Sequence, residues 1–218
     1  MMKKYFLSAA GFIGTKVGLS PEDQEVVAYG LEVTFSLFIS LILALVLGYF
    51  LGIVAETLMV ALVWMIVRSL AGGAHCSTLW RCAIFSTLVM VFLGSAARLF
   101  SSFDPKLVIV IILLCGFIAL TITFIWAPAD NAKNRILSAS RRRKFRDKAL
   151  AVEIALIMFL LLACHFTGNE YSSLLLAGGM AMLVETLTVL PVGYRVMAFL
   201  DKLLERVEKA VWRGGEQL

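Results

Sequence analysis

The reactive side chains of this sequence are concentrated in one short stretch, RSLAGGAHCSTLWRC, at residues 68–82. The stretch holds one of the two histidines, His75, and two of the four cysteines, Cys76 and Cys82. A cysteine attacks as its thiolate, and because a free thiol has a pKa of about 8.5, it needs a neighbouring base or a positive field. A histidine within hydrogen-bond reach can accept the thiol proton and then pair with the thiolate. These residue types therefore predict a cysteine nucleophile with a histidine base.

The spacing of the two residues limits how the chain folds between them. His75 and Cys82 are seven residues apart, so a continuous helix would separate them by about 10.5 Å along its axis. A catalytic pair therefore requires a break in the helix, and the two glycines at 72–73 mark one. We expect His75 to fold back from this break toward Cys82.

A new helix is expected to begin beyond the break. Ser77 or Thr78 is suited to cap its N-terminus, which places the first helical residue near Leu79. Cys82 would then lie in the first turns, close to the partial positive charge of the helix N-terminus. Cys76 is a rival nucleophile, but side chains that are adjacent in sequence generally diverge. We therefore assign the attack to Cys82.

The sequence does not indicate metal or cofactor chemistry. A zinc protease needs about three protein ligands at close spacing, as in H-E-x-x-H, whereas the second histidine, His165, is expected a membrane's thickness away from His75. Cys115 and Cys164 lie in apolar runs, and the four cysteines form no C-x-x-C pattern. Walker A and G-x-S-x-G motifs are absent from the sequence. We therefore expect no metal, no cofactor and no nucleic-acid partner.

The rest of the chain supplies membrane helices that would position this stretch. Of the 218 residues, 61% are hydrophobic and 16% are charged, and the mean hydropathy is +0.91. Soluble domains average about 45–50% apolar and about 25% charged residues, and a membrane span needs about 20 mostly apolar residues. We predict an all-α polytopic membrane protein that forms a single integral membrane domain over residues 1–218. Its six spans are expected near residues 31–50, 53–70, 79–99, 107–126, 149–167 and 171–192.

Amphipathic segments flank the six spans. Residues 1–19 are expected to lie on the membrane surface, and the S-P-E-D sequence that begins at Ser20 is typical of a helix start. The tail at 194–213 has the pattern of an amphipathic helix. Its apolar face consists of Val196, Phe199, Leu200, Leu203, Leu204, Val207 and Val211. We expect this helix to lie on the inner membrane surface or to pair with a partner helix, which would make a homodimer.

The basic residues predict the orientation of the chain. With a cytoplasmic N-terminus and six crossings, all of the 20 Lys and Arg residues except Arg98 and Lys106 fall on the cytoplasmic side. This distribution is the one that the positive-inside rule describes. Both termini, the 68–82 stretch and a basic loop at 127–148 are therefore predicted to be cytoplasmic.

The basic loop at 127–148 has two interpretations. Its residues fix the topology and bind anionic lipid, each contributing about 1 kcal/mol near a negative leaflet, or they form a docking patch for an acidic peptide. The candidate docking residues are Lys133, Arg135, Arg141, Arg142 and Arg143.

A third residue is expected to orient the His75 ring, and acidic side chains in the spans are the candidates. Glu32 and Glu185 fall in the cytoplasmic halves of their spans, where an acidic side chain is usually functional or paired. Both are candidates to orient His75. Pairing with Arg68 or Arg81 is the alternative.

The stretch resembles a known family of membrane proteins. Arg68, Gly72, Gly73, His75 and Cys82, in the pattern R-S-L-A-G-G-A-H-C-x5-C, are similar to the accessory gene regulator protein B (AgrB) family of bacterial membrane cysteine endopeptidases. Further similarity, in the same order, is carried by YGLE at 29–32, WAPAD at 126–130 and ETLTVLP at 185–191. The family often continues the alanine-proline element with lysines and a proline, whereas this chain reads NAKNRI.

The resemblance implies the maturation of a quorum-sensing peptide at the bacterial cell membrane. Cys82 would attack an AgrD-like propeptide near its C-terminal part, with His75 as general base and then as acid. An acidic tail would leave, and a Cys or Ser of the peptide would take over the acyl group to close a thiolactone or lactone. Arg68 and Gly73 would support this site. From their position alone, Ser69 and Ser77 are candidates to stabilise the oxyanion.

Two other functions compete with the peptidase. In a small transporter or exporter, Glu56, Glu185 and Arg98 would line a path and the His/Cys stretch would be structural. A non-catalytic membrane scaffold would tolerate the loss of both His75 and Cys82.

Overall fold

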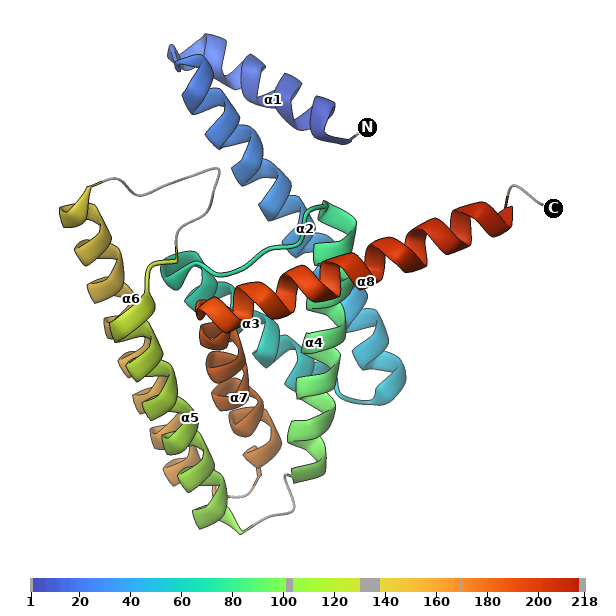
Figure 1. Ribbon diagram of the computed structural model, residues 1–218. Coiled ribbons are helices and arrows are strands. Elements are labelled where there is room, and N and C mark those ends of the chain that lie inside the picture. The colour runs from blue at the N-terminus through green and yellow to red at the C-terminus, as the bar shows by residue number, and fades with distance from the viewer. Residues whose placement is uncertain (1, 101–103, 130–137, 169, 216–218) are drawn as a thin grey trace.

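The computed structural model describes residues 2–100, 104–129, 138–168 and 170–215, and these residues form eight α-helices and no β-strand (Figure 1). The helices are α1 (Met2–Val17), α2 (Pro21–Leu51), α3 (Val54–Ala71), α4 (Leu79–Phe100), α5 (Pro105–Trp126), α6 (Ala139–Thr167), α7 (Ser172–Leu187) and α8 (Pro191–Gly215). Five of them are long and apolar enough to cross a membrane, and the bent pair α7 and α8 makes a sixth if it counts as one span. The prediction of an all-α polytopic membrane protein is confirmed.

The bundle is organised around α7, which packs against α3, α4, α5 and α6. Its middle carries the glycines at 178–179, and a Cβ added at Gly178 would stand 3.0 Å from a methyl carbon of Leu160. Small residues allow helix backbones to approach closely in a membrane, where packing replaces the hydrophobic effect between helices. Around α7 the core includes Trp64, Met90 and Met182, all nearly fully buried.

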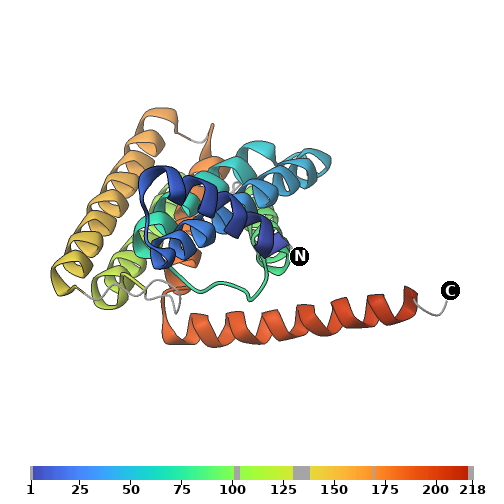
Figure 2. The same cartoon turned by 90° about the horizontal axis from the view of Figure 1, so that it is seen from above.

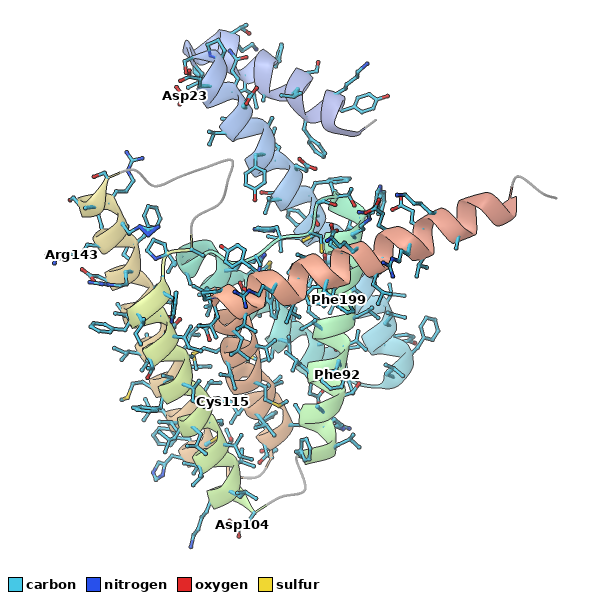
Figure 3. The ribbon with its side chains drawn as sticks, viewed as in Figure 1. Asp23, Phe92, Asp104, Cys115, Arg143 and Phe199 are labelled. Carbon is cyan, nitrogen blue, oxygen red and sulfur yellow. The ribbon has the colours of Figure 1, made fainter. Side chains whose placement is uncertain are left out.

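The outer surface of the bundle is apolar between its two ends. Figure 3 shows Arg143 and Asp104 at opposite ends, with Phe92 between them. Phe92 and Phe117 are 69% and 70% exposed. Soluble monomers rarely expose large contiguous apolar patches, so this surface is suited to lipid.

One end of the bundle carries the candidate residues of the 68–82 stretch, and we call it the site end. Here α3 stops at Ala71, α4 starts at Leu79, α5 stops at Trp126 and α7 stops at Leu187. Residues 72–78 connect α3 to α4 without regular structure. The axis of α8 is bent by 90° from that of α7, so α8 runs across the site end and extends beyond the bundle (Figures 1 and 2).

The start of α2 confirms the expected helix signal. Pro21 is the first helical residue, and the Ser20 side chain accepts a hydrogen bond from the backbone N–H of Asp23 at 3.1 Å. The helix has 31 residues and is therefore about 46 Å long, which exceeds a hydrocarbon core of about 30 Å. Its N-terminal part projects beyond the site end, with α1 packed against it (Figure 1).

The basic segment differs from the expected loop. Residues 127–148 were predicted to form a loop, but α6 begins at Ala139, so the last part of the segment is helical. Ser138 caps this helix, because its side chain accepts a hydrogen bond from the backbone N–H of Arg141. Lys and Arg are also good helix formers, and a boundary drawn from hydropathy alone misses a polar first segment of a helix.

The sixth predicted span is also divided. The segment 171–192 was expected to be one helix, but α7 ends at Leu187 and α8 begins at Pro191. Proline lacks a backbone N–H and clashes with a preceding helical turn, so it suits the first position of a new helix. The tail helix consequently starts before the expected residue 194.

Candidate catalytic site

The helix break that the His75–Cys82 pair requires is present. Gly72 and Gly73 follow the last residue of α3 with φ angles of +75° and +150°, a region that residues with a Cβ rarely adopt. Beyond them the chain returns across the site end. This path places Nδ1 of His75 3.9 Å from Sγ of Cys82.

The first turn of α4 carries the thiol. Of the two expected capping residues, Thr78 takes the role, because its Oγ1 accepts a hydrogen bond from the backbone N–H of Arg81 at 3.4 Å. The carbonyl of Thr78 accepts from the N–H of Cys82 at 3.1 Å. Cys82 therefore lies at the N-terminus of α4, where the aligned peptide dipoles favour a negative charge.

Backbone hydrogen bonds tie the end of α3 and the 72–78 segment to two other parts of the chain. The N–H of Ala74 donates to the carbonyl of Thr188, just after α7, at 3.2 Å. The carbonyl of Ala71 accepts from the N–H of Ala129, just after α5, at 2.8 Å. Contacts with Thr188 after α7 and with Ala129 after α5 therefore hold the position of this segment.

A buried ion pair supports the histidine. Nη1 of Arg68 donates to both carboxylate oxygens of Glu185, at 2.9 and 3.1 Å, and the two side chains are only 9% and 0% exposed. Nη2 of Arg68 donates to the carbonyl of Ala74 and lies 3.1 Å from Nδ1 of His75. Because a guanidinium only donates, Nδ1 of His75 is the acceptor and the neutral ring carries its proton on Nε2. Of the two alternatives that the sequence left open for Glu185, the structure shows the pairing with Arg68, and Arg68 in turn contacts His75.

Gly73 is required by the same ion pair. A Cβ at this position would overlap Oγ1 of Thr188 and would stand 3.3 Å from both Nη1 of Arg68 and Oε1 of Glu185. A glycine therefore lets the segment pass directly over the paired charges. The sequence pointed to Gly73 as a helix break, and the close approach is a second reason for it.

The rival thiol, Cys76, also lies near the pair, although its side chain was expected to diverge. Its Sγ is 3.6 Å from Sδ of Met197 on α8. A hydrogen bond to the Cys82 thiol, together with burial, raises the pKa of the Cys76 thiol above its ordinary value. Cys76 consequently holds less thiolate than a free cysteine at neutral pH, which favours Cys82 as the nucleophile.

Three of the remaining candidates have different surroundings. Glu32 lines the pocket beside the pair. The backbone N–H of Ser77 donates to Asp201 of α8 at 3.1 Å, and its hydroxyl accepts from Arg81. The Ser69 hydroxyl donates to the carbonyl of Ile66, on its own helix. The hydroxyls of both serines are thus hydrogen-bonded to groups other than the Cys82 thiol, although Ser77, like Glu32, lines the pocket.

The pocket around the thiol, which we call the cysteine pocket, is partly open and comprises about 500 Å³ of space when the adjoining open solvent is included. Its walls include Tyr29, Val33, Leu37, His75, Cys82 and Ser86. The rings of Tyr29 and His75 meet edge to face, with centroids 6.3 Å apart. Sequence reasoning did not assign Tyr29 to the site, although the YGLE motif that contains it was noted.

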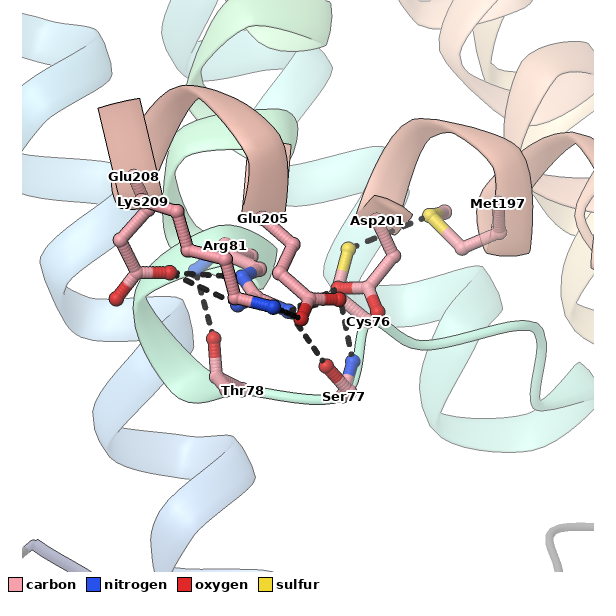
Figure 4. Close-up of polar contacts among 9 residues, drawn as sticks. All are labelled: Cys76, Ser77, Thr78, Arg81, Met197, Asp201, Glu205, Glu208 and Lys209. Atoms are coloured by element: carbon pink, nitrogen blue, oxygen red, sulfur yellow. Dashed lines mark hydrogen bonds and ion pairs between the residues drawn. The ribbon is translucent and has the colours of Figure 1, made fainter. Parts of the chain in front are cut away.

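Sequence reasoning also missed the contact between α8 and the start of α4. Nη2 of Arg81 is 2.8 Å from Glu208, and Nη1 lies 3.7 Å from Asp201 and 3.9 Å from Glu205 (Figure 4). The three acids are spaced by four and three residues, so they share one face of α8. The spacing of these three acids was the sequence feature that could have predicted a basic partner on this face of α8.

The candidate docking residues are only partly described. Lys133 and Arg135 lie outside the described residues. Arg142 and Arg143 line a pocket at the start of α6 together with Arg146, which the sequence did not single out. Arg141 is exposed and is not among the residues that line this pocket.

Within the described residues, no group of three His, Cys, Asp or Glu side chains is placed to hold a metal ion. His165 lies in the last turn of α6, at the end of the bundle opposite to His75. The chemistry available at the site is therefore that of a thiol, an imidazole and a buried guanidinium–carboxylate pair.

Comparison with known proteins gives matches over most of the chain. The model of the family described as Accessory gene regulator B matches residues 8–189. The chain is 27% identical to Protein FsrB of Enterococcus faecalis, over 88% of this chain and 80% of that protein. It is 26% identical to Accessory gene regulator protein B of Staphylococcus lugdunensis, over 84% and 81% of the two chains. It is 27% identical to the protein of the same name from Staphylococcus aureus, over 77% and 83%. No solved structure matches the chain significantly.

Proposed function

The chain belongs to the accessory gene regulator B family, and from this premise we propose that it is a membrane-embedded cysteine endopeptidase that cleaves a quorum-sensing propeptide. The observation that carries the proposal is the 3.9 Å distance between Sγ of Cys82 and Nδ1 of His75. The two atoms meet at one end of a polytopic bundle, where a peptide on the membrane surface can reach them. The site end faces the cytoplasm of a bacterial cell in this proposal, with both termini on the same side.

The reaction begins with the thiol. Nδ1 of His75 releases the hydrogen bond from Arg68 and accepts the proton of Cys82, and Sγ attacks a backbone carbonyl carbon of an AgrD-like propeptide. When the tetrahedral intermediate collapses, the C–N bond breaks and His75 gives its proton to the leaving amine. The N-terminal part of the peptide then remains on Cys82 as a thioester.

The charge of Arg68 favours transfer of the proton from His75 to the leaving amine. Its guanidinium lies 3.1 Å from Nδ1 of His75 and interacts electrostatically with Cys82. A positive charge stabilises a thiolate but destabilises an adjacent imidazolium. Protonated His75 is therefore a strong acid toward the leaving amine, while Glu185 keeps Arg68 in place.

Ring closure follows from the same thioester. A Cys or Ser of the bound peptide attacks the acyl carbon, its proton passes by way of His75 to the departing Sγ of Cys82, and the product is a thiolactone or lactone. Water would give a linear acid instead, so the site must exclude it. Val33, Leu37 and Leu79 in the wall of the cysteine pocket serve this purpose.

The pairing of the membrane acids favours the peptidase over a transporter. Glu56 pairs with Arg98 at 2.9 Å and accepts a hydrogen bond from Ser173 at 2.8 Å. Glu185 is occupied by Arg68. Carboxylates with fixed cationic partners stabilise helix packing and are poorly suited to line a transport path.

The test is mass spectrometry of a candidate precursor incubated with the reconstituted protein. Wild type should release the C-terminal fragment and carry an acyl adduct on Cys82, and Cys76→Ala should do the same. Cys82→Ala and His75→Ala should release no fragment. Cleavage that persists without Cys82 would exclude the proposed nucleophile and return the 68–82 stretch to a structural role.

A further inference from the structure

Two thiols share the same pocket at the site end. Cys76 and Cys82 both line the cysteine pocket, and their side chains are joined by a hydrogen bond. Cys76 comes from the irregular 72–78 segment, and Cys82 comes from the start of α4. The proposed cleavage reaction uses Cys82 alone. It therefore leaves a second thiol, in contact with the nucleophile, without a chemical role.

The placement of the two thiols is compatible with a disulfide bond. A disulfide requires an S–S distance of about 2.05 Å and Cα atoms about 4.4–6.8 Å apart, and hydrogen-bonded thiols start with their sulfur atoms already in contact. Residues 72–78 have no regular structure, so the side chain of Cys76 can approach Cys82 without unwinding a helix. The bridge would close only a short loop, because Cys82 follows Cys76 by six residues. The helices of the bundle therefore need not move when it forms.

The surroundings of Cys82 also favour its attack on a peroxide. Nδ1 of His75 lies 3.9 Å from Sγ of Cys82 and can take the thiol proton. The guanidinium of Arg68 interacts electrostatically with Cys82, and the N-terminus of α4 adds a partial positive charge. These groups favour a thiolate, which is the form of cysteine that peroxides oxidise. The cysteine pocket is partly open, so a small peroxide can reach the sulfur.

We propose that Cys76 and Cys82 form a site of reversible oxidation, at which a peroxide converts the two thiols to a disulfide and switches the peptidase off. Cys82 reacts with the peroxide, and Cys76 is the resolving thiol that closes the bridge before Cys82 is oxidised further. The effect on cleavage rests on the proposed function, whereas the bond between the two sulfur atoms does not depend on it.

The oxidation proceeds in two steps. His75 takes the proton of Cys82, Sγ attacks one peroxide oxygen, and the O–O bond breaks as the departing oxygen takes the proton from His75. Cys82 is then a sulfenic acid, and the peroxide has become water or an alcohol. In the second step the Cys76 thiol loses its proton, its Sγ attacks Sγ of Cys82, and the S–O bond breaks, so that hydroxide leaves with that proton as water. Two electrons pass in total from the two sulfur atoms to the peroxide.

Cys76 is suited to react second. Its hydrogen bond to Cys82, its burial and the negative charge of a Cys82 thiolate all raise the pKa of the Cys76 thiol, so it reacts more slowly with the peroxide than Cys82 does. A sulfenic acid at Cys82 is neutral, so the repulsion is gone and Cys76 can ionise and attack. On the cytoplasmic side, where the proposed function places the site end, dithiol reductants return a disulfide to thiols. They do not return a sulfinic acid, and Cys76 therefore protects the nucleophile.

The first test detects the bond itself. Trypsin cuts after arginine, so it places Cys76 on the peptide 69–81 and Cys82 on the peptide 82–98. The reconstituted full-length protein is treated with hydrogen peroxide, blocked with a maleimide and run on a non-reducing gel, and the monomer band is digested. The two peptides should be linked by a bond that a dithiol breaks, whereas Cys115, buried in α5, should stay reduced. Oxygen gained by the Cys82 peptide without any link would overturn the inference.

The second test uses Cys76→Ala, which should cleave the precursor at the wild-type rate before oxidation. Peroxide should stop cleavage by both proteins. A dithiol should return wild type to within about twofold of its starting rate but Cys76→Ala to less than about a tenth, because an unresolved sulfenic acid at Cys82 continues to sulfinic acid. Dimedone, which traps sulfenic acids, should label Cys82 much more in Cys76→Ala than in wild type. Cys115→Ala is the matched control and should behave as wild type does throughout.

The outcomes separate this inference from the proposed function. Linked peptides from a protein that cleaves no precursor would support the disulfide and contradict the peptidase. If wild type cleaves but Cys76→Ala recovers equally well in dithiol, or if dimedone labels the two proteins equally, Cys76 is not the resolving thiol and the inference is wrong. A disulfide found only between two copies of the chain would overturn it as well.

Discussion

Removing the charge of Glu185 is the sharpest perturbation that the site offers. Glu185→Gln keeps the shape of the side chain but leaves the guanidinium of Arg68 buried without a counter-charge, since the two side chains are 0% and 9% exposed. Breaking one partner of a buried pair costs about 3–5 kcal/mol, and the remaining amide oxygen places the expected loss near 3 kcal/mol. That loss shifts the unfolding equilibrium by roughly a hundredfold. Cleavage should fall as well, because the hold of Arg68 on His75 is loosened.

A double variant separates stability from catalysis. Replacing Arg68 by Met and Glu185 by Leu removes both buried charges, and such replacements are often neutral or stabilising. The carbonyl of Ala74 then loses its donor, at a cost of about 1–3 kcal/mol, so part of the lost stability should return. Cleavage should not return, because nothing then holds Nδ1 of His75.

Unfolding in mixed micelles, followed by tryptophan fluorescence, gives the stabilities, and mass spectrometry of the precursor gives the cleavage rates of the same preparations. Glu56→Gln is the matched control at the opposite end of the bundle. Its partner Arg98 is 60% exposed and stays solvated, so the stability loss should be smaller and cleavage should be unchanged. The reasoning would be refuted if Glu185→Gln had the same free energy of unfolding as wild type, or if the double variant cleaved the precursor at the wild-type rate.

Three further predictions concern the surroundings of the pair. Gly73→Ala should abolish cleavage, because its Cβ would overlap Thr188 and strain the backbone; an active Gly73→Ala protein would contradict the close approach. Cys76 should react slowly with a maleimide at pH 7 and faster as the pH rises, because its raised pKa keeps it protonated; in Cys82→Ala, which removes the hydrogen bond that raises this pKa, labelling should accelerate. Arg81→Ala should increase amide exchange along α8 while lowering the free energy of unfolding by only about 1 kcal/mol, because exposed carboxylates form weak pairs; unchanged exchange would show that other contacts hold α8.

The sequence predicts the local features of this site well. A glycine pair, a capping hydroxyl and a seven-residue spacing are enough to place a break before α4 and to bring His75 back toward Cys82. Each of these signals acts within one or two helical turns. The helix start at Ser20 was predictable for the same reason.

Contacts between distant segments were not decided by the sequence. Glu185 lies 117 residues from Arg68, and the sequence left open whether the acids orient His75 or pair with Arg68 or Arg81. The structure divides them: Arg68 takes the buried acid of α7, and Arg81 takes the three acids of α8. The choice depends on the 90° bend after α7, which hydropathy does not encode because both helices contain apolar residues.

The position of α8 is coupled to the nucleophile through one turn of helix. Arg81 precedes Cys82, so its bonds to Asp201 and Glu208 act on the turn that places Sγ beside His75. Along the same stretch of α8, apolar side chains such as Leu203 and Val207 are 47% and 54% exposed. If this face rests on the membrane surface, as its amphipathic pattern predicts, the surface that presents the peptide also sets the height of α8. The site then lies at the same depth as the peptide on the membrane surface. Detaching α8 should therefore slow cleavage even though the residues that carry out the reaction are unchanged.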